Sequence, residues 1–324
     1  MPSQQVPLHS GFGRTSTASD VINGIDLHGQ VAIVTGGYSG IGLETTRVLS
    51  RAGATITVPA RNAGKAREAI AGIPRVEVAE LDLGDPASID NFAMDFVARG
   101  CPLHLLVNNA GIMAVPLGRD RRGHELHFAT NHLGPFQLTV RLWPALLRAG
   151  AARVVILSSG AHRRAAFDFD DPDFERREYD KWKAYAESKT ASSLFAVALD
   201  SRGETRGIRA FAVHPGRIET GLQRAISMPE LQALGLRDRN GQIPASHRSL
   251  YKTVEQGAAT TVWCATSPVL DGMGGVYCED ADIAAAVPVT HEPLDGVLPW
   301  AIDPAAAERL WQLSERLTGV SLPA

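Results

Sequence analysis

Short runs of β-branched and aliphatic residues alternate with longer stretches of helical periodicity along most of the chain. The predicted strands are Val31–Thr35, Thr55–Val58, Val76–Leu81, Leu103–Val107, Arg153–Leu157, Ile208–His214 and Gly275–Cys278. The predicted helices lie near residues 41–52, 62–72, 86–99, 122–149, 182–202 and 254–266. Because the strands are almost continuously apolar, both of their faces should be buried, as in a parallel sheet covered by helices on each side. With right-handed crossovers, the pattern predicts a doubly wound α/β (Rossmann-type) fold with a mostly parallel, seven-stranded sheet.

A single domain accounts for most of the chain in this interpretation. Residues 29–318 are predicted to form it, with a substrate-lid insertion near residues 217–250, and residues 1–28 are expected to form an extended arm. Proline cannot donate a hydrogen bond inside a central strand, so Pro59 predicts that the second strand ends at Val58.

The sequence TGGYSGIG (Thr35–Gly42) directly follows the first predicted strand and opens a helix. Its glycines allow a tight turn and a close approach of the backbone to a pyrophosphate at the helix N-terminus. The same glycines could form a plain tight turn. Their position at the start of a βαβ unit favours nucleotide binding.

Two further polar stretches end predicted strands. LVNNAGI (Leu106–Ile112) ends the fourth strand, and ILSSGAH (Ile156–His162) ends the fifth. The carboxyl ends of parallel strands meet at one edge of the sheet, where ligands bind in doubly wound folds. Taken singly, an Asn-rich turn or a serine at a strand end is more often structural.

Two tyrosines each precede a lysine by four residues, Tyr179 with Lys183 and Tyr185 with Lys189. On a helix such a pair shares one face, and an ammonium group can lower the pKa of a nearby phenol. The neighbours of Tyr179 in FERREYDKWK are mostly charged, so we expect solvent to screen that pair. Lys189 leads into the apolar sequence TASSLFAVAL, which predicts a helix docked on the sheet. Tyr185 is therefore the predicted acid.

Composition excludes several classes of partner. The 324 residues carry a net charge of −3 without a basic block, which predicts no nucleic-acid partner. No apolar run approaches the length of a membrane span, and the N-terminal residues lack the apolar core of a signal peptide. Cys101, Cys264 and Cys278 have no metal-binding spacing, and free cysteines suit a reducing compartment. We therefore predict a cytoplasmic protein without a metal site.

Together, these motifs resemble the short-chain dehydrogenase/reductase family. The matching features, in family order, are TGxxxGxG at 35–42, LDL with Asp82, NNAG at 108–111, Asn131 in TNHLG, Ser159, YxxxK at 185–189 and HPG at 214–216. The segments NHLGPFQLT, KTVEQGAATTVWCA and GGVYCEDADIA resemble the group that contains retinol dehydrogenases, the WW-domain oxidoreductase and Tic32. The resemblance covers roughly residues 10–318.

The resemblance implies hydride transfer between a nicotinamide and a carbonyl or carbinol carbon. It implies that Tyr185 exchanges the proton, that Lys189 lowers the pKa of Tyr185 and holds the ribose, and that Ser159 binds the substrate oxygen. Asn131 is implied to bend its helix and hold a water, although it could simply hydrogen-bond a neighbouring strand.

The resemblance also implies a set of cofactor contacts along the same edge. The implied residues are Gly36, Ser39, Gly40, Ile41, Gly42, Arg61, Asp82, Leu83, Asn108, Ala110, Gly111, Tyr185, Lys189, Pro215, Gly216, Ile218 and Thr220. Thr220 could instead be an ordinary helix cap.

The end of the second strand predicts which cofactor is used. An NAD-specific enzyme usually has an acidic residue there, which binds the ribose 2′-hydroxyl. In TITVPARN, Ala60 occupies that position and Arg61 follows. An arginine can bind a 2′-phosphate, so NADP(H) is predicted to be preferred over NAD(H). Arg61 could also be a solvated charge at the start of a helix.

We therefore predict an NADP(H)-dependent alcohol dehydrogenase or carbonyl reductase for a small or apolar substrate. The alternative is a catalytically weak NADP(H)-binding regulatory or scaffold protein, which would not need all four of Asn131, Ser159, Tyr185 and Lys189. Sugar-nucleotide epimerases and dehydratases share YxxxK, but their glycine loop is spaced differently. The substrate stays open, as does the oligomeric state, for which a homo-oligomer is one alternative.

Overall fold

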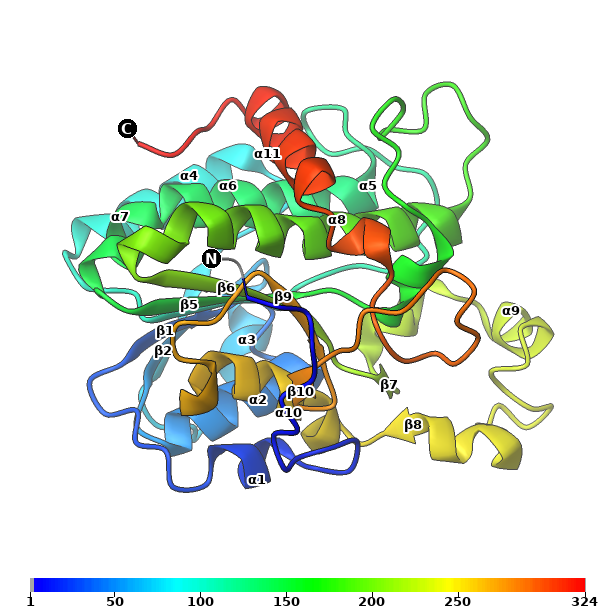
Figure 1. The fold of residues 1–324 in the computed structure, drawn as a ribbon, viewed down its shortest axis with the longest axis horizontal. Helices are drawn as coiled ribbons and strands as arrows, with labels where there is room; N and C mark the ends of the chain where they lie inside the picture. The colour runs from blue at the N-terminus through cyan, green and yellow to red at the C-terminus, as the bar shows by residue number, and fades with distance from the viewer. Residues whose placement is uncertain (1–2, 324) are drawn as a thin grey trace.

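The computed structural model describes residues 3–323, in which an eight-stranded sheet lies between two layers of helices (Figure 1). The strands are β1 Val31–Val34, β2 Thr55–Ala60, β3 Val76–Glu80, β4 Leu105–Asn108, β5 Ala152–Leu157, β6 Ile208–His214, β9 Val276–Glu279 and β10 Asp282–Ile283. Their order across the sheet is β10-β9-β6-β5-β4-β1-β2-β3, and only β10 pairs antiparallel in this described part. The predicted doubly wound α/β fold is confirmed.

The predicted count of seven strands is wrong because the chain turns back after β9. Asp280 and Ala281 both have positive φ, 50° and 58°, which is the backbone of a two-residue hairpin turn. Neither residue is glycine or asparagine, so the sequence carried no strong hairpin signal. The extra strand, β10, follows this turn.

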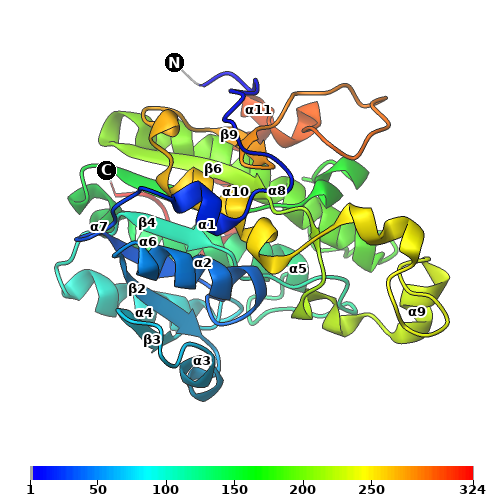
Figure 2. The same cartoon turned by 90° about the horizontal axis from the view of Figure 1, so that it is seen from below.

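Helices cover both faces of the sheet (Figures 1 and 2). One face carries α1 Ala18–Ile22, α2 Gly40–Arg51 and α10 Val254–Thr266; the other carries α4 Pro86–Ala98, α6 Gly134–Arg141 and α8 Lys181–Gly203, with α11 Pro304–Thr318 packed on α8. Ile33 belongs to the core beneath α4, α6 and α8, while Ala32 and Val34 belong to the core beneath α2 and α10. This two-sided burial explains why the central strands are almost continuously apolar, while the edge strand β3 contains two glutamates. Within residues 3–323, no helix combines the length and the apolarity needed to cross a membrane.

Strand β2 continues through Pro59 to Ala60, so its predicted end at Val58 is wrong. The Thr55 N–H donates toward β1, to Gln30 O, and the Ile56 N–H donates toward β3, to Arg75 O. Backbone nitrogens of β2 therefore point alternately toward β1 and β3, and the nitrogen of Pro59 points toward β1. The pairing of β2 with β1 already ends at Thr57. Proline therefore costs no sheet hydrogen bond at this position.

The stretch predicted as one helix over 122–149 consists of several short elements. These are α5 Leu126–Phe128, a π-helical turn at Ala129–Leu133, α6 and α7 Trp143–Arg148. A π turn inserts one extra residue into a helix and is frequent at functional sites. Here the inserted turn contains Asn131.

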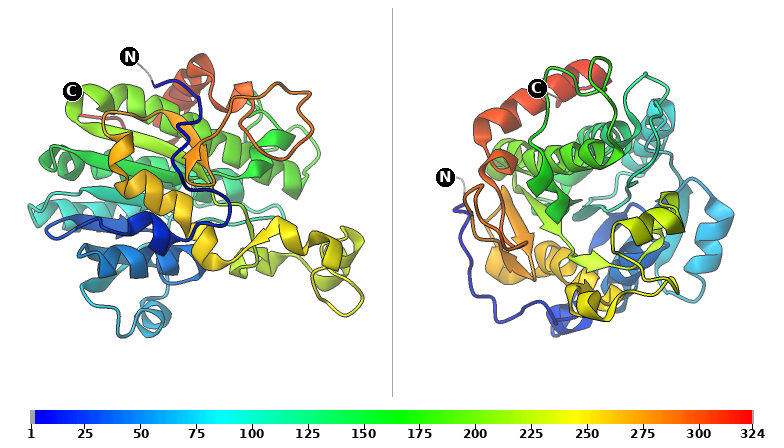
Figure 3. Two further views of the ribbon diagram at one scale, coloured as in Figure 1. Left: turned by 60° about the horizontal axis from the view of Figure 1, so that its bottom comes forward. Right: turned by 90° about the vertical axis from the view of Figure 1, so that its right-hand side faces the viewer.

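The insertion at 217–250 projects beyond the carboxyl edge of the sheet (Figure 3). Its two ends pair as the short parallel strands β7 Arg217–Ile218 and β8 Tyr251–Lys252. Between them lies α9 Met228–Ala233. The pairing of β7 with β8 holds the base of the insertion against the domain. Elsewhere in the chain, the short helix α3 Ala63–Ala69 follows β2.

The N-terminal segment crosses the β9–β10 end of the sheet before it reaches α1 (Figure 1). The side-chain amide of Gln5 bonds to the backbone of Tyr277 and Ala284, and the carboxylate of Asp282 accepts from the N–H groups of Leu8 and Ser10. These contacts cover an edge that would otherwise present unpaired backbone groups.

Candidate active site

The implied site residues gather where the carboxyl ends of β1, β4, β5 and β6 meet. The sheet order reverses its winding between β1 and β4, and the loops that follow these two strands diverge there. Such a switch point is where doubly wound folds bind their ligands.

The loop after β1 requires glycine for its shape. Gly36 and Gly40 have positive φ, 65° and 51°. A Cβ on Gly42 would lie 2.4 Å from both Gly36 O and Asn109 Nδ2. Ser39 is the N-cap residue of α2, and its side chain makes no capping hydrogen bond, while Ile41 lies in the first turn. The result is a bare backbone cradle at the start of a 12-residue helix.

Asn109 braces this cradle, although the sequence had not singled it out. Its Nδ2 donates to Thr35 O at 2.8 Å, and its N–H and that of Ala110 donate to Thr35 Oγ1 at 2.9 and 3.0 Å. Asn108 turns away, and its Nδ2 donates to Thr139 Oγ1 in α6 at 3.1 Å. The NNAG motif in the sequence indicated that an asparagine was important here. Only the structure shows that the second asparagine, Asn109, stabilises the glycine loop.

Tyr185 lies near the start of α8 with 6% of its surface exposed. Burial raises the pKa of Tyr185 to about 12, and a hydrogen bond with Ser159 partly opposes this rise. Ser159 caps a 3-10 turn, and its Oγ accepts from the Ala161 N–H at 3.1 Å. Ser159 therefore hydrogen-bonds both the turn that follows it and the Tyr185 phenol.

Lys189 lies one helical turn after Tyr185. Its Nζ donates to Leu157 O at 2.7 Å and lies 5.8 Å from the centre of the Tyr185 ring. Burial lowers the pKa of Lys189 to about 8. Burial raises the pKa of Tyr185 and the Ser159 hydrogen bond opposes the rise, so the lowering by Lys189 that the resemblance implies stays a prediction.

Asn131 connects the π turn to the segment after β4. Its Oδ1 accepts from the Ile112 N–H at 2.9 Å, and its Nδ2 donates to Ile112 O and to Ser188 Oγ, both at 3.0 Å. A Cβ on Gly111 would lie 3.0 Å from Asn131 Oδ1 and 3.7 Å from Lys189 Nζ. Gly111 therefore leaves room beside the two polar side chains.

Tyr179 is not in the solvated environment that its sequence predicted. Tyr179 precedes α8, so it does not share a helix face with Lys183. The Lys183 side chain is exposed, and its Nζ lies 4.0 Å from Glu187 Oε1. The Tyr179 hydroxyl lies 3.0 Å from both Val115 O and Glu125 Oε1, and its one proton is shared between these two acceptors. Burial and the Glu125 carboxylate raise the pKa of Tyr179 well above its usual range. The charged neighbours in sequence point elsewhere, and the tyrosine packs inward.

The implied adenine-side residues lie at the ends of β2 and β3. Arg61 is exposed and, within residues 3–323, makes no hydrogen bond or ion pair. Asp82 Oδ1 accepts from the Gly84 N–H at 2.9 Å, which shapes the loop after β3. Leu83 is buried against Gly134 of α6.

The chain after β6 closes the other side of the cradle. Gly216, which follows Pro215, has φ 95°, and a Cβ there would lie 2.8 Å from Cδ of Lys252. Ile218 lies in β7, and the methyl group of Thr220 would lie 3.3 Å from a Cβ on Gly40. Thr220 Oγ1 also accepts from the Leu222 N–H at 3.3 Å, so the side chain is a helix cap that faces the glycine loop.

Two histidines fix the loops around Ser159. His162 Nδ1 lies 2.8 Å from Ser159 O, and its Nε2 accepts from the Leu298 N–H at 3.2 Å. His214 Nδ1 accepts from the Gly160 N–H at 3.0 Å. Burial lowers the pKa of His162 to about 4 and that of His214 to about 3, so both rings are neutral near pH 7. They act as hydrogen-bonding supports.

Comparison with known proteins places this geometry in a family. The sequence model described as "short chain dehydrogenase" matches residues 30–230, which is more than half of the chain. The chain belongs to the short-chain dehydrogenase/reductase family. The predicted family is thereby confirmed, and with it an oxidoreductase that uses a nicotinamide cofactor and a small-molecule substrate.

Three similar proteins illustrate the range of this family. A Streptomyces lividans protein named "Probable oxidoreductase" is 47% identical over 89% of this chain and 97% of its own length. The "Short-chain dehydrogenase TIC 32 B, chloroplastic" of Brassica napus is 36% identical over 97% of this chain and 96% of its own. A crystal structure of an uncharacterised protein from Mycobacterium paratuberculosis covers 94% of this chain and 98% of its own, with a TM-score of 0.71 and 31% identity. The predicted Tic32-like group is thus represented.

The residues of this short-chain dehydrogenase fit a dinucleotide. The glycines of the Gly36–Gly42 loop leave backbone uncovered by side chains at the start of α2, where a pyrophosphate would bind. The loop's own packing also requires glycine at 42, since a Cβ there would lie 2.4 Å from Gly36 O. In residues 3–323, no group of His, Cys, Asp or Glu side chains could hold a metal ion.

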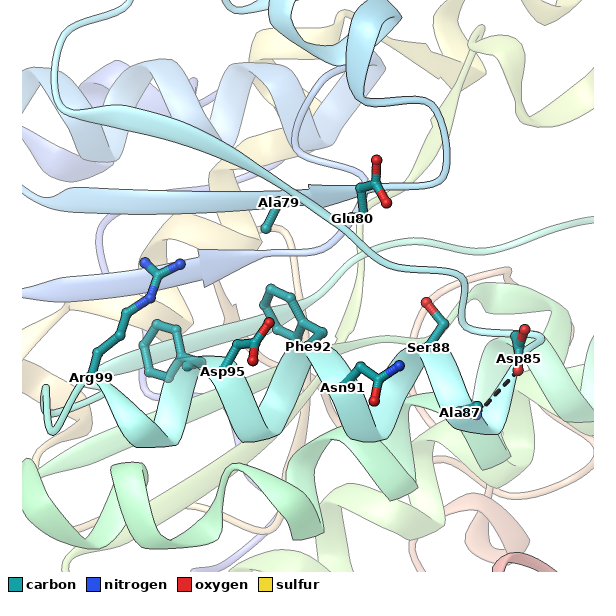
Figure 4. A pocket seen from close by; sticks show the side chains of 10 residues that line it. Ala79, Glu80, Asp85, Ala87, Ser88, Asn91, Phe92, Asp95 and Arg99 are labelled. Atoms are coloured by element: carbon teal, nitrogen blue, oxygen red, sulfur yellow. Dashed lines mark hydrogen bonds between the residues drawn. The ribbon is translucent and has the colours of Figure 1, made fainter.

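A hollow of about 370 Å³ lies away from the site, between β3 and α4 (Figure 4). Glu80, Asp85, Asp95 and Arg99 are among the residues that line it. None of the residues assembled at the carboxyl edge lines it.

Proposed function

We propose that this short-chain dehydrogenase/reductase is an NADP(H)-dependent carbonyl reductase, or alcohol dehydrogenase in the reverse direction. The observation that carries the proposal is the placement of buried Tyr185 and Lys189, with half-buried Ser159, beside the glycine cradle. With a pKa raised to about 12, Tyr185 holds its proton at neutral pH, as a donor to a carbonyl oxygen must.

The chain's own residues would divide the work of reduction as follows. Ser159 donates a hydrogen bond to the carbonyl oxygen, and Tyr185 transfers its proton to that oxygen as negative charge develops. A bound nicotinamide dinucleotide supplies the hydride that goes to the carbonyl carbon. The Lys189 ammonium, at 5.8 Å from the Tyr185 ring centre, stabilises the phenolate that is left behind. Asn131 keeps Gly111 and Ile112 in place beside these groups.

A NADPH-consumption screen against aldehydes and ketones of graded size tests this function. Turnover of at least one carbonyl class is expected, with saturation in both NADPH and the carbonyl compound. If no carbonyl is reduced while NADPH binds tightly, the protein is the regulatory or scaffold alternative, and the enzymatic proposal is wrong.

The proposed NADP(H) preference rests on the end of β2. Ala60 cannot bind a ribose 2′-hydroxyl, and the exposed guanidinium of Arg61 is free to bind a phosphate. Arg61→Ala should lower kcat/KM for NADPH about tenfold or more, as expected for the loss of a charge-assisted hydrogen bond, and leave the value for NADH unchanged. Arg67→Ala removes the same charge from exposed surface on α3 and should leave the NADPH-to-NADH ratio as it is. A wild type that prefers NADH would contradict the preference.

The pH dependence of reduction should follow Lys189. Its ammonium is charged below its pKa of about 8 and loses the charge above it, while Tyr185, at about 12, keeps its proton throughout. We therefore expect kcat/KM for reduction to be level below about pH 8 and to fall above it. In Lys189→Arg the fall should move to higher pH, because guanidinium stays protonated. An unchanged profile in Lys189→Arg would show that another group titrates.

We also propose that residues 29–318 act as one catalytic domain with the 217–250 insertion as its substrate lid. Ile226 and Leu231 of the insertion pack on Ala114 near the site, which supports an apolar substrate. A cytoplasmic location and the lack of a nucleic-acid partner remain proposals, supported by three free cysteines and the net charge of −3. Size-exclusion chromatography would determine whether a homo-oligomer forms.

A further inference from the structure

The segment Ile112–Val115 follows the NNAG motif at the end of β4 and lies beside the candidate substrate site. Side chains from other parts of the chain hydrogen-bond the backbone at both of its ends. The Asn131 amide bonds both the N–H and the C=O of Ile112. At the other end, the Val115 N–H donates to His127 Nε2 at 3.3 Å, and Val115 O accepts from the Tyr179 hydroxyl at 3.0 Å. The segment belongs to no strand or helix, so these four bonds position it.

The middle of this segment forms the apolar wall. Ala114 is fully buried against Ile226 and Leu231 of the insertion, and Met113 and Trp182 pack on the same cluster. Ala114 has φ 53°, in the left-handed region that residues with a Cβ rarely adopt. Such a conformation persists only where the surroundings hold it. The wall therefore depends on the hydrogen bonds at its two ends.

The support at Val115 continues into a buried, hydrogen-bonded group formed by His127 and Glu125. Because the Val115 N–H donates to Nε2, we assign the proton of the neutral His127 ring to Nδ1, which lies 2.7 Å from Glu125 Oε1. The other carboxylate oxygen of Glu125 accepts from the Phe128 N–H at 2.8 Å. The side chains of Glu125 and His127 are 1% and 0% exposed. Both side chains thus have their polar atoms hydrogen-bonded inside the protein.

Tyr179 completes the group from a different part of the chain. Its hydroxyl lies 3.0 Å from both Val115 O and Glu125 Oε1, and its ring packs edge-on against Phe174 with centres 5.2 Å apart. Tyr179 belongs to the segment 162–181, which leads from the turn after Ser159 into α8. That segment therefore reaches back to hold the wall.

We propose that Tyr179, His127 and Glu125 are positioning residues, which set the place of the Met113–Ala114 wall and thereby the size of carbonyl compound that fits beside Tyr185. The His127 ring also meets the Tyr185 ring edge-on, with centres 6.1 Å apart, so the wall and the proton donor share a support. This inference rests on the proposed carbonyl reductase activity.

Tyr179→Phe tests the inference, because it keeps the ring on Phe174 and removes only the hydroxyl. For the ketone that the wild type uses best, KM should rise about tenfold, the equivalent of one lost hydrogen bond, while kcat changes much less. Discrimination between small and large ketones should weaken. KM for NADPH and the pH profile should stay as in the wild type, which loss of general stability would not produce.

Amide hydrogen exchange gives a second measurement that does not depend on turnover. Exchange at residues 112–115 should become at least about tenfold faster in Tyr179→Phe. Tyr277→Phe is the matched control, since its buried hydroxyl has no hydrogen-bond partner within residues 3–323. This control should change neither the exchange nor KM.

The outcomes separate this inference from the proposed function. If the wild type reduces carbonyls and Tyr179→Phe retains its KM, size discrimination and slow exchange, the positioning role is overturned although the function stands. If the wild type reduces no carbonyl, the function fails, and exchange alone supports or overturns the positioning. Should Tyr179→Phe not fold, Glu125→Gln breaks the same group from its other end and must give the same changes.

Discussion

Tyr185→Phe should lower kcat for carbonyl reduction about 10³-fold, within the range of about 10²–10⁴ that a general acid contributes. Phenylalanine fills the same buried space at the start of α8, so the fold and the affinity for NADPH should change little. The loss should fall on kcat, because Tyr185 donates its proton to the substrate oxygen during the chemical step. Steady-state kinetics with NADPH held at saturation measures this effect.

Tyr179→Phe supplies the contrast for this prediction. Both tyrosines precede a lysine by four residues, but only Tyr185 lies with its lysine on one helix, while Tyr179 bonds Val115 O outside that helix. We therefore expect a kcat defect for Tyr185→Phe and a KM defect for Tyr179→Phe. If the two variants exchanged these defects, the assignment of the acid would be wrong.

Lys189→Met should lower kcat/KM about 10²–10³-fold, the usual effect of removing one preorganised electrostatic group from an active site. Methionine matches the length of the lysine stem but carries no charge, so the developing phenolate at Tyr185 loses its stabilisation. KM for NADPH should rise as well, since the same ammonium is proposed to hold the ribose. Fluorescence titration with NADPH measures the binding part separately from the rate.

The stability of this variant provides its control. Loss of the Lys189 Nζ bond leaves Leu157 O without its 2.7 Å partner, at a cost of about 1–3 kcal/mol. Removing a buried ammonium should offset part of that cost. A thermal midpoint close to that of the wild type, together with the loss in rate, would assign the effect to chemistry. Full activity in Lys189→Met would remove Lys189 from the mechanism.

The fold class could be predicted from the sequence because its signals lie in short contiguous stretches of the chain. Near-continuous apolar strands separated by helices require a sheet buried on both faces, and the glycine loop requires a bare backbone turn at the first of them. The implied positions of Ser159, Tyr185 and Lys189 follow from strand ends and from the helical spacing of four residues. The structure brings these three side chains to one edge of the sheet.

Other features depend on partners that are distant in the sequence. Pro59 is harmless only because its nitrogen faces the side on which β1 has already ended. The pKa of Tyr185 is raised because the packed fold buries its phenol, and no spacing rule in the sequence contains that burial. Asp280 and Ala281 have positive φ although neither is glycine, so the residue types at this turn did not predict a hairpin or the strand β10 that follows it.

By itself, the sequence determined the doubly wound sheet, the glycine cradle and the family, because each of these is written in contiguous motifs whose spacing is set by backbone geometry. The tertiary structure alone decided what the second tyrosine does. Tyr179 sits among charged neighbours in the chain, yet it contacts Val115 and Glu125, more than 50 residues away in the sequence. Burial is a property of the packed molecule, and only the packed molecule shows that both tyrosines turn inward and which groups each of them contacts.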